Sequence, residues 1–453
     1  MKLNKKLLAT GVLTASLFAG QAWGAVSAEE AAKLGDTLTP MGAERAGNGG
    51  DIPAWTGGLT TPPAGYNNDG IYVDPFAGEQ PKFVIDQSNV DQYADKLSPG
   101  QIAMIRQYPD YKLPVYPTHR TAVYPQDIMD ETVKNATRSE LIQNGNGIGN
   151  YANATPFPIP QNGLEVIWNH ITRYRGGSVQ RNVGQVTPTA NGAFSVVKFQ
   201  DELTWNRYLS DYQEGQDDNV LFYFKQAITA PARLAGNVLL VHETLDQVKE
   251  PRRAWIYNAG QRRVRRAPQV AYDGPGTAAD GMRTSDNFDM FNGAPDRYNW
   301  ELLGKKEMYI PYNSYKLVDR NLSYSDIIKA GHINQDLTRY ELHRVWHVRA
   351  TLKDGERHVY AQRDFYVNED SWQASVIDHY DGRGELWRVA EAHAMQFYDQ
   401  DVPWYAIEVL YDLLSGRYLA LGLTNEESNP YTFGVERQSR DYTPAALRRA
   451  GTR

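Results

Sequence analysis

The chain of 453 residues contains 41% hydrophobic and 22% charged residues, which is enough apolar material for a folded core. Its formal net charge of −7 argues against a general nucleic-acid-binding protein, because such proteins carry positive charge to meet the phosphates. The absence of cysteine excludes disulfides, thiol catalysis and acylation of a cysteine that follows a leader peptide.

Residues 1–24 have the features of a secretory signal peptide. Three lysines lie within the first six residues, and the apolar run Leu7–Gly20 is too short to span a bilayer. The small residues Ala22 and Gly24 predict cleavage before Ala25. No later apolar run is long enough for a transmembrane helix. Because the leader carries three lysines and no acid, we expect a soluble mature chain of net charge −10, exported to the periplasm or cell envelope of a Gram-negative bacterium and not lipid-modified.

Residues 25–163 are rich in proline, glycine and asparagine, and we expect an extended N-terminal arm with short helices. Ser98 and Gln101 have the spacing of a capping box, which predicts a helix that runs to about Gln107. A second helix is expected over Pro125–Gln143, where the sequence NGNG ends it.

The glycine-rich stretch Leu38–Gly58 contains an indole, Trp55. A solvent-exposed tryptophan on a flexible tail does not stabilise the protein, whereas burial of its indole ring contributes roughly a few kcal/mol. We therefore expect Trp55 to dock on the main body of the protein.

Residues 164–453 begin with an amphipathic helix over Leu164–Tyr174, followed from about Ala193 by strands. Tight Asp-Gly and Gly-containing links predict about nine to eleven strands in sequential antiparallel order. A sheet this long has to curve or be covered, because a flat one would expose an apolar face. The predicted fold class is α+β, mainly β, with one large curved antiparallel sheet (a half-barrel) wrapped around helices and the arm outside.

One strand places an arginine among apolar residues. In RHVYAQRDFYV, Arg363 alternates with Phe365 and other apolar side chains on one face. An arginine on an apolar face has to be paired or open to a cavity. We expect Arg363 to face the interior, where its acceptor is either a carboxylate from a covering helix or the head group of a ligand; a bulge near Gln362 would invert the faces.

Aromatic side chains on the predicted strands are either ordinary core or part of a cavity wall. The candidates for a ligand cavity, beside Arg363, are Trp255, Tyr257, Phe222, Phe224 and Phe365.

A basic run stands out in this acidic chain and consists of Arg262, Arg263, Arg265 and Arg266. These arginines are either solvated and paired with nearby acids, or a patch that faces anions such as lipid head groups or an acidic partner.

No motif in the sequence selects a catalytic or metal site. His343 and His347 are four residues apart, but the surrounding ELHRVWHVRATL reads as a strand, on which that spacing is about 13 Å. No HExxH, GxSxG or phosphate-binding glycine loop is present, so we predict no metal ligand, no cofactor and no catalytic residue. A glycosidase-like pair of carboxylates stays open as an alternative.

Six segments together resemble a known family: RRAWIYNAGQRRVRRAPQ, the following DGMRTSDNFDMFNG, LTPMGAERAGNGGDIPAWTGG, VYPTHR, RYNWELLGKKEMYIPYN and DFYVNEDSW. The chain is identified from them as a member of the bacterial domain-of-unknown-function family 1329 (DUF1329), within the outer-membrane lipoprotein-sorting (LolA/LolB-like) superfamily. The resemblance implies a half-barrel that holds helices, with an apolar cavity for acyl chains. It also implies association with an outer-membrane β-barrel and an inner-membrane efflux-type permease, and it brings no catalytic residues.

The hypothesis is therefore a periplasmic, non-enzymatic carrier for a lipid or other apolar small molecule, with membership of an envelope transport system as a further hypothesis. The first alternative is an adaptor of an outer-membrane β-barrel with a solidly packed sheet, and the second is an envelope hydrolase. A continuous apolar void of several hundred Å³ would favour the carrier, and a filled core would favour the adaptor.

Overall fold

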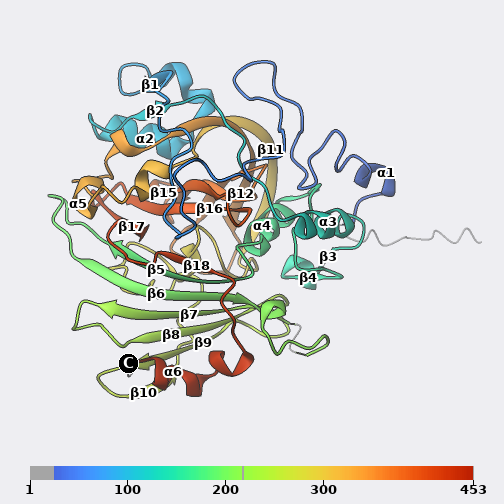
Figure 1. Cartoon of the computed structure of the whole chain (residues 1–453), viewed down its shortest axis with the longest axis vertical. Coiled ribbons are helices and arrows are strands. Elements are labelled where there is room, and N and C mark those ends of the chain that lie inside the picture. Colours follow the sequence, from blue (N-terminus) through green and yellow to red (C-terminus); the bar gives the residue numbers. More distant parts are fainter. Residues whose placement is uncertain (1–24, 217–218, 452–453) are drawn as a thin grey trace, which may run out of the picture.

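The computed structural model describes residues 25–216 and 219–451, so the predicted signal peptide lies outside the described residues. Within these ranges, sixteen strands form one large curved sheet, and two short strands form a separate hairpin (Figure 1). The prediction of a mainly β fold with one large antiparallel half-barrel is confirmed. No helix in the described part of the chain is long and apolar enough to cross a membrane.

The N-terminal elements are mostly short. In chain order they are α1 (Ala28–Ala31), β1 (Phe83–Ile85), the 3-10 helix η1 (Val90–Lys96), α2 (Pro99–Gln107), β2 (Leu113–Val115), α3 (Gln126–Asn135), β3 (Glu140–Ile142), β4 (Gly147–Gly149) and α4 (Gly163–Thr172). The predicted capping box of α2 is confirmed: Gln101 N donates to Ser98 Oγ at 3.1 Å, and Ser98 N donates to Gln101 Oε1 at 3.0 Å.

The helix expected over Pro125–Gln143 is shorter than predicted. It ends at Asn135, whose side chain bonds the backbone of Ala152 and Thr155. The chain beyond it forms β3, which pairs with β4 instead of continuing the helix.

The large sheet consists of two antiparallel meanders. The first contains β5 (Ser178–Val186), β6 (Val196–Trp205), β7 (Val220–Ala230), β8 (Val238–Thr244), β9 (Arg253–Asn258) and β10 (Arg263–Arg266). The second contains β11 (Tyr298–Pro311), β12 (Tyr340–Leu352), β13 (Gln362–Asn368), β14 (Ala374–Tyr380), β15 (Leu386–Phe397), β16 (Val402–Asp412) and β17 (Arg417–Leu423). The short helices α5 (Tyr324–Ile327) and α6 (Pro444–Gly451) and the strand β18 (Tyr431–Phe433) complete the fold.

The order of the strands differs from the sequential run that we expected. The last strand of the second meander, β17, pairs antiparallel with β5, the first strand of the first meander. The first meander begins at Ser178 and not near Ala193, where the sequence predicted its start, because β5 carries polar residues and a glycine that hide its alternation. The sheet is not closed: β10 pairs only with β9 among the described strands.

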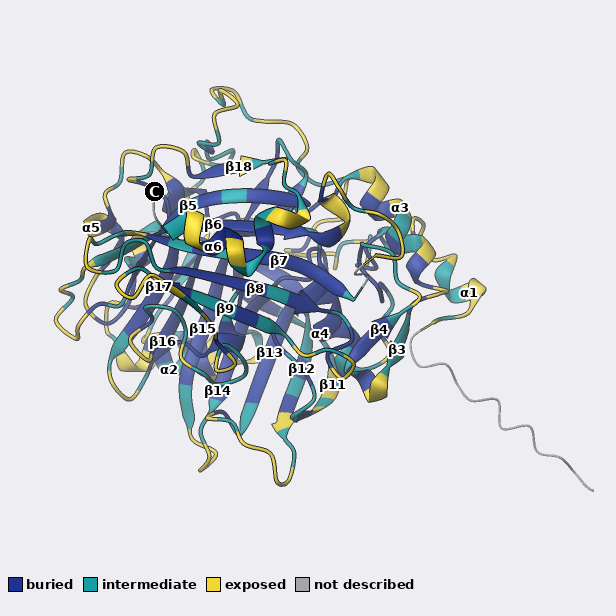
Figure 2. Ribbon diagram, turned by 90° about the horizontal axis from the view of Figure 1, so that it is seen from below, coloured by how far each residue is buried: buried dark blue, intermediate teal, exposed yellow. Residues whose placement is uncertain are grey.

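Both faces of the second meander are covered. On the inner face, α4 buries Val166, Ile167 and Trp168 against the sheet. On the outer face, α2 buries Met104, Ile105 and other apolar residues against the same strands. The upstream helices therefore do not all lie inside the sheet, as we had expected; they divide between its two faces. Figure 2 shows the strands buried along most of their length, with exposed residues gathered in the loops and on α6.

Candidate ligand site inside the half-barrel

Residues 267–297, which connect β10 to β11, fold back across the inner face of the sheet; we call this stretch the interior segment. It includes the 3-10 helix η4 (Ser285–Asn287). Its apolar side chains join the inner core, namely Ala267, Ala279, Met282, Met290 and Phe291. Together with α4, the interior segment occupies the space that a ligand of the half-barrel would need.

Asp289 ties the interior segment to the end of α4. Its carboxylate accepts hydrogen bonds from Arg173 Nη2 at 2.6 Å and from Arg175 Nη1, and all three side chains are buried. Burial alone would raise the pKa of Asp289, but the two guanidinium groups outweigh it and lower the pKa to about 2. Asp289 and Met290 have φ of 52° and 65°, a backbone conformation that these contacts hold against its cost.

Asp286 provides a second tie, to β13. Its Oδ2 accepts from Arg363 Nη2 at 3.0 Å and lies 3.0 Å from His358 Nε2. Burial raises the pKa of this carboxyl, and Arg363 and His358 more than reverse the effect, so the pKa ends below its ordinary value. Arg363 therefore lies on the inner face, and of the two expected acceptors the structure has the carboxylate, which comes from the 3-10 helix η4 of the interior segment.

A small apolar pocket remains between the interior segment and strands β7 and β8. Its volume is about 40 Å³. Its apolar lining consists of Phe222, Phe224, Leu239, Val241, Val270 and Phe288. This volume is far below the several hundred Å³ that would mark a preformed acyl-chain cavity, so the interior of the described structure is filled.

A larger hollow lies beside this pocket, at the base of the interior segment. It has a volume of about 360 Å³ and is lined by residues from both ends of the segment, among them Pro268, Tyr272 and Ala294. Arg252 lines the hollow and the pocket alike. Its guanidinium is paired with Glu243, whose Oε2 lies 2.6 Å from Arg252 Nη2. The hollow and the pocket are thus neighbours that share one wall.

The predicted cavity residues fall into three groups. Phe222 and Phe224 line the pocket. Phe365 lies on the inner face with Arg363, in contact with Phe291 of the interior segment at a centroid distance of 5.5 Å. Trp255 and Tyr257 lie on the opposite face of β9, in the cluster that α6 covers, and so do not belong to the pocket.

The basic run forms the free edge of the sheet. Arg263, Arg265 and Arg266 belong to β10 and are exposed, and Arg262 precedes it with a φ of 52°. Arg266 lies over the ring of Trp255, with its guanidinium carbon 5.7 Å from the centroid. The arginines do not approach the pocket, and their role in binding anions stays a prediction.

The two histidines of HRVWH lie on β12, as the strand interpretation predicted. His343 Nε2 is 2.9 Å from Glu341 Oε2, and His347 Nε2 is 3.8 Å from Asp364 Oδ2. In the described ranges, no group of three or more potential ligand side chains could hold a metal ion.

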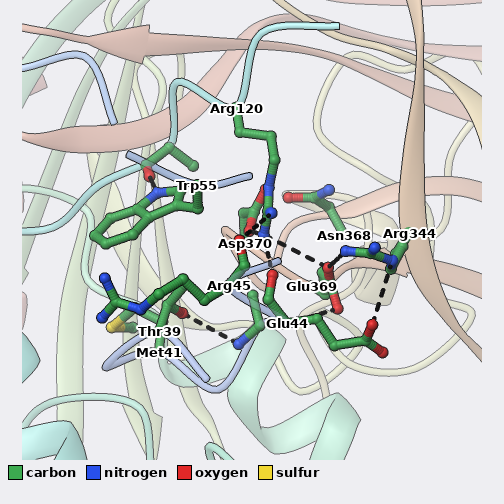
Figure 3. Close-up of polar contacts among 12 residues, drawn as sticks. Thr39, Met41, Glu44, Arg45, Trp55, Arg120, Arg344, Asn368, Glu369 and Asp370 are labelled. Atoms are coloured by element: carbon green, nitrogen blue, oxygen red, sulfur yellow. Dashed lines mark hydrogen bonds and ion pairs between the residues drawn. The ribbon is translucent and has the colours of Figure 1, made fainter. Parts of the chain in front are cut away.

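A second buried polar network joins the N-terminal arm to the sheet (Figure 3). Arg120 binds Asp370 through two nitrogens, Nε at 2.9 Å and Nη2 at 2.7 Å, and donates to the backbone oxygens of Glu44, Arg45 and Pro53. Four of the segments that identify the family meet here, since Lys305 also binds Glu369, with Nζ 2.8 Å from Oε2. Every hydrogen-bonding nitrogen of Arg120 has a partner, so this network has a structural role: it holds the N-terminal arm against the sheet.

The arm docks through its tryptophan at the same place. Trp55 Nε1 donates to Ala122 O at 3.1 Å, and its ring packs against the inner core. The guanidinium carbon of Arg45 lies 5.6 Å from the ring centroid. Trp372 Nε1 donates to Met41 O at 3.0 Å, which fixes the start of the loop. The predicted docking of Trp55 is confirmed.

Sequence reasoning missed the interior segment and its Arg283, which lies in the pocket wall. The signal was available in DGMRTSDNFDMFNG, where Met282, Phe288 and Phe291 recur among charged residues. A surface loop would not be expected to repeat large apolar residues in this way.

The fold and site together define a half-barrel protein whose interior is occupied by its own chain. The chain belongs to the family described as protein of unknown function (DUF1329), which it matches over residues 84–448. It is 67% identical over 455 residues to the uncharacterized protein PA3922 of Pseudomonas aeruginosa, with all of both chains covered.

Two solved structures are more distant. A DUF1329 family protein from Desulfovibrio piger has 12% identity and a TM-score of 0.41, with 60% of this chain and 92% of that chain covered. The LolA superfamily protein NE2245 from Nitrosomonas europaea has 14% identity and a TM-score of 0.37, with coverage of 62% and 97%. The identification of the family from the sequence is confirmed.

Proposed function

We propose that this protein is a non-enzymatic carrier of an apolar ligand in the bacterial cell envelope, and that the ligand enters between β7, β8 and the interior segment. The observation that carries the proposal is the apolar pocket of about 40 Å³ that adjoins a hollow of about 360 Å³ at the base of the segment. A long acyl chain in water loses about 0.8 kcal/mol of stabilisation per exposed CH₂ group, so transport across an aqueous compartment needs an apolar sleeve. The inner face of the half-barrel would provide one only after the interior segment moves aside.

Binding requires the interior segment to move away from the sheet. Its centre is held by the ion pairs of Asp286 and Asp289, whereas its two ends border the hollow. A chain that enters from the hollow would therefore first displace Val270, near the start of the segment, and leave the central ties in place.

The test is the binding of a fluorescent fatty acid by the purified chain, combined with mass spectrometry of lipid that copurifies with it. Leu239→Phe fills the pocket and should weaken binding by at least about tenfold if pocket volume is limiting. Leu240→Phe is the matched control, because this neighbour lies on the opposite face of β8 under α6. Equal binding by both variants and wild type would contradict the proposed site.

The second candidate is an adaptor that docks to an outer-membrane β-barrel. The filled interior supports it, as does the exposed basic edge strand β10, which offers charge and unpaired backbone to a partner. A chain that repeatedly purifies without lipid and binds no fatty acid would favour the adaptor. The suggested partners, a β-barrel and an efflux-type permease, rest on the family resemblance and call for crosslinking in whole cells.

A hydrolase receives less support. The buried carboxyls Asp378 and Glu391 both have a pKa raised to about 7 by burial, but α2 covers them. Asp378 accepts from Ser98 Oγ and Gly100 N at 2.9 and 3.1 Å, and Glu391 accepts from Tyr340 at 2.8 Å. These contacts give both groups a role in holding the helix.

A further inference from the structure

Arg283 is a buried cation in the wall of the pocket without a carboxylate partner. It is 4% exposed, and neither Nε nor Nη1 has a hydrogen-bond partner in the described structure. No carboxylate oxygen of the described residues lies within 4.0 Å of its guanidinium, whose only aromatic support is Phe288, at 5.5 Å from guanidinium carbon to centroid. Burial lowers the pKa of Arg283, as expected for a cation removed from water.

The other buried arginines of the interior are all paired. Arg173 and Arg175 share Asp289, Arg181 binds Asp201 with Nε 3.1 Å from Oδ2, and Arg363 binds Asp286. Because Asp289 serves two arginines, the paired groups already carry one positive charge in excess. Arg283 adds a second.

Neither carboxylate in the neighbourhood of Arg283 forms an ion pair with it, although Glu408 and Asp201 both act favourably on its charge from a greater distance. Asp201 already accepts from Arg181 and from Gln226 Nε2, the latter at 3.0 Å. Glu408 accepts from Met290 N at 3.2 Å through one oxygen, while its other oxygen has no partner in the described structure. Burial raises the pKa of Glu408 to about 7, so near neutral pH it is only partly ionised.

We propose that the ligand of the pocket ends in an anionic oxygen head group, a carboxylate or a phosphate, which binds the guanidinium of Arg283 while its apolar chain lies along Phe222, Phe224 and Leu239. The inference rests on the proposed carrier function and narrows the ligand to an anionic amphiphile. An unpaired buried cation is costly, and the arrival of an anion removes that cost only when the ligand is bound. Arg283 offers forked donors that match either head group.

The experiment measures binding of three probes by the purified chain: palmitate, lysophosphatidate with the same chain, and neutral hexadecanol. Wild type should bind one or both anions at least about tenfold more tightly than hexadecanol, as expected for a charge-assisted hydrogen bond. Arg283→Met should abolish this preference without changing the affinity for hexadecanol. Binding of palmitate alone would identify a free fatty acid, and binding of lysophosphatidate alone a phospholipid head group.

The failures of the two proposals are distinguishable. If none of the three probes binds to wild type, the carrier function fails. If all three bind equally and Arg283→Met behaves like wild type, the carrier stands and the anionic head group is overturned.

Thermal unfolding without ligand gives an independent readout. Removal of an uncompensated charge should leave the Tm of Arg283→Met equal to or above that of wild type, whereas Arg181→Met, which strands Asp201, should lower it. Palmitate or lysophosphatidate should raise the Tm of wild type and not of Arg283→Met. If Arg283→Met does not fold, the probe preference of the wild type decides. A wild type that binds the anions no more tightly than hexadecanol overturns the inference, and a wild type that prefers the anions supports it.

Discussion

Two buried arginines illustrate how differently the same side chain is used in this fold. Arg120, between the N-terminal arm and the sheet, binds Asp370 through two nitrogens and three backbone oxygens besides. Arg283, on the inner face, has two nitrogens without any partner in the described structure. A fully paired buried arginine holds elements together, whereas an unpaired one leaves a charge that something else has to meet. Arg120 therefore has a structural role, whereas Arg283 marks a candidate ligand-binding site.

The largest expected effect comes from removing Arg120, which joins the N-terminal arm to the sheet. Arg120→Met should lower the free energy of unfolding by about 3–5 kcal/mol, because it leaves the buried carboxylate of Asp370 without its cation. Urea unfolding monitored by tryptophan fluorescence measures the change, with Arg283→Met as the matched substitution at an unpaired site. Equal destabilisation by the two variants would show that Arg120 and Arg283 do not differ in their contribution to stability.

The next effect concerns pH and the carboxyls beneath α2. Among the described residues, neither Asp378 nor Glu391 forms an ion pair with a lysine or arginine, and burial raises the pKa of each to about 7, above its ordinary value. The fold therefore favours their protonated forms. Their contribution to stability is complete below about pH 4 and is lost as the pH rises through 7, by up to about 1.4 kcal/mol per pH unit for each group.

Urea unfolding at pH 5, 6, 7 and 8 measures this decline. Glu391→Gln should flatten part of it, whereas Glu140→Gln, a substitution outside this cluster, should leave it unchanged. A free energy of unfolding that stays constant or rises from pH 5 to pH 8 in wild type would show that these carboxyls are ionised and satisfied in the folded protein.

The smallest effect is expected at Trp55, at the edge of the Arg120 network. Trp55 is only partly buried, so Trp55→Ala should cost about 1–3 kcal/mol and should free the loop around it. Limited proteolysis should then cut within residues 38–58 faster than in wild type. Cleavage of this stretch in the wild type as fast as in the variant, with no change in the melting temperature of the body, would mean that the docked tryptophan does not hold the arm.

Much of the local structure was determined by the sequence itself. The capping box of α2, the strand Arg253–Asn258, the strand around His343 and the hairpin turn after Tyr380 all follow from hydrogen bonds or side-chain alternation among near neighbours in the chain. The inner position of Arg363 also follows from alternation, over the part of the segment that is strand. The assignment of faces by alternation fails before Gln362, where Tyr360 is buried and Val359 is exposed.

Only the tertiary structure decided how these pieces are assembled. The pairing of β17 with β5 joins strands more than 200 residues apart, and no local preference specifies it. The same holds for the partner of Arg363, which is Asp286 on the interior segment, and for the division of the helices between two faces. Alternation assigns a residue to one side of a strand, but what fills that side depends on which distant segment buries the most apolar surface there. In this protein that segment is residues 267–297, and the charge it leaves unpaired at Arg283 exists only because the chain folds back on itself.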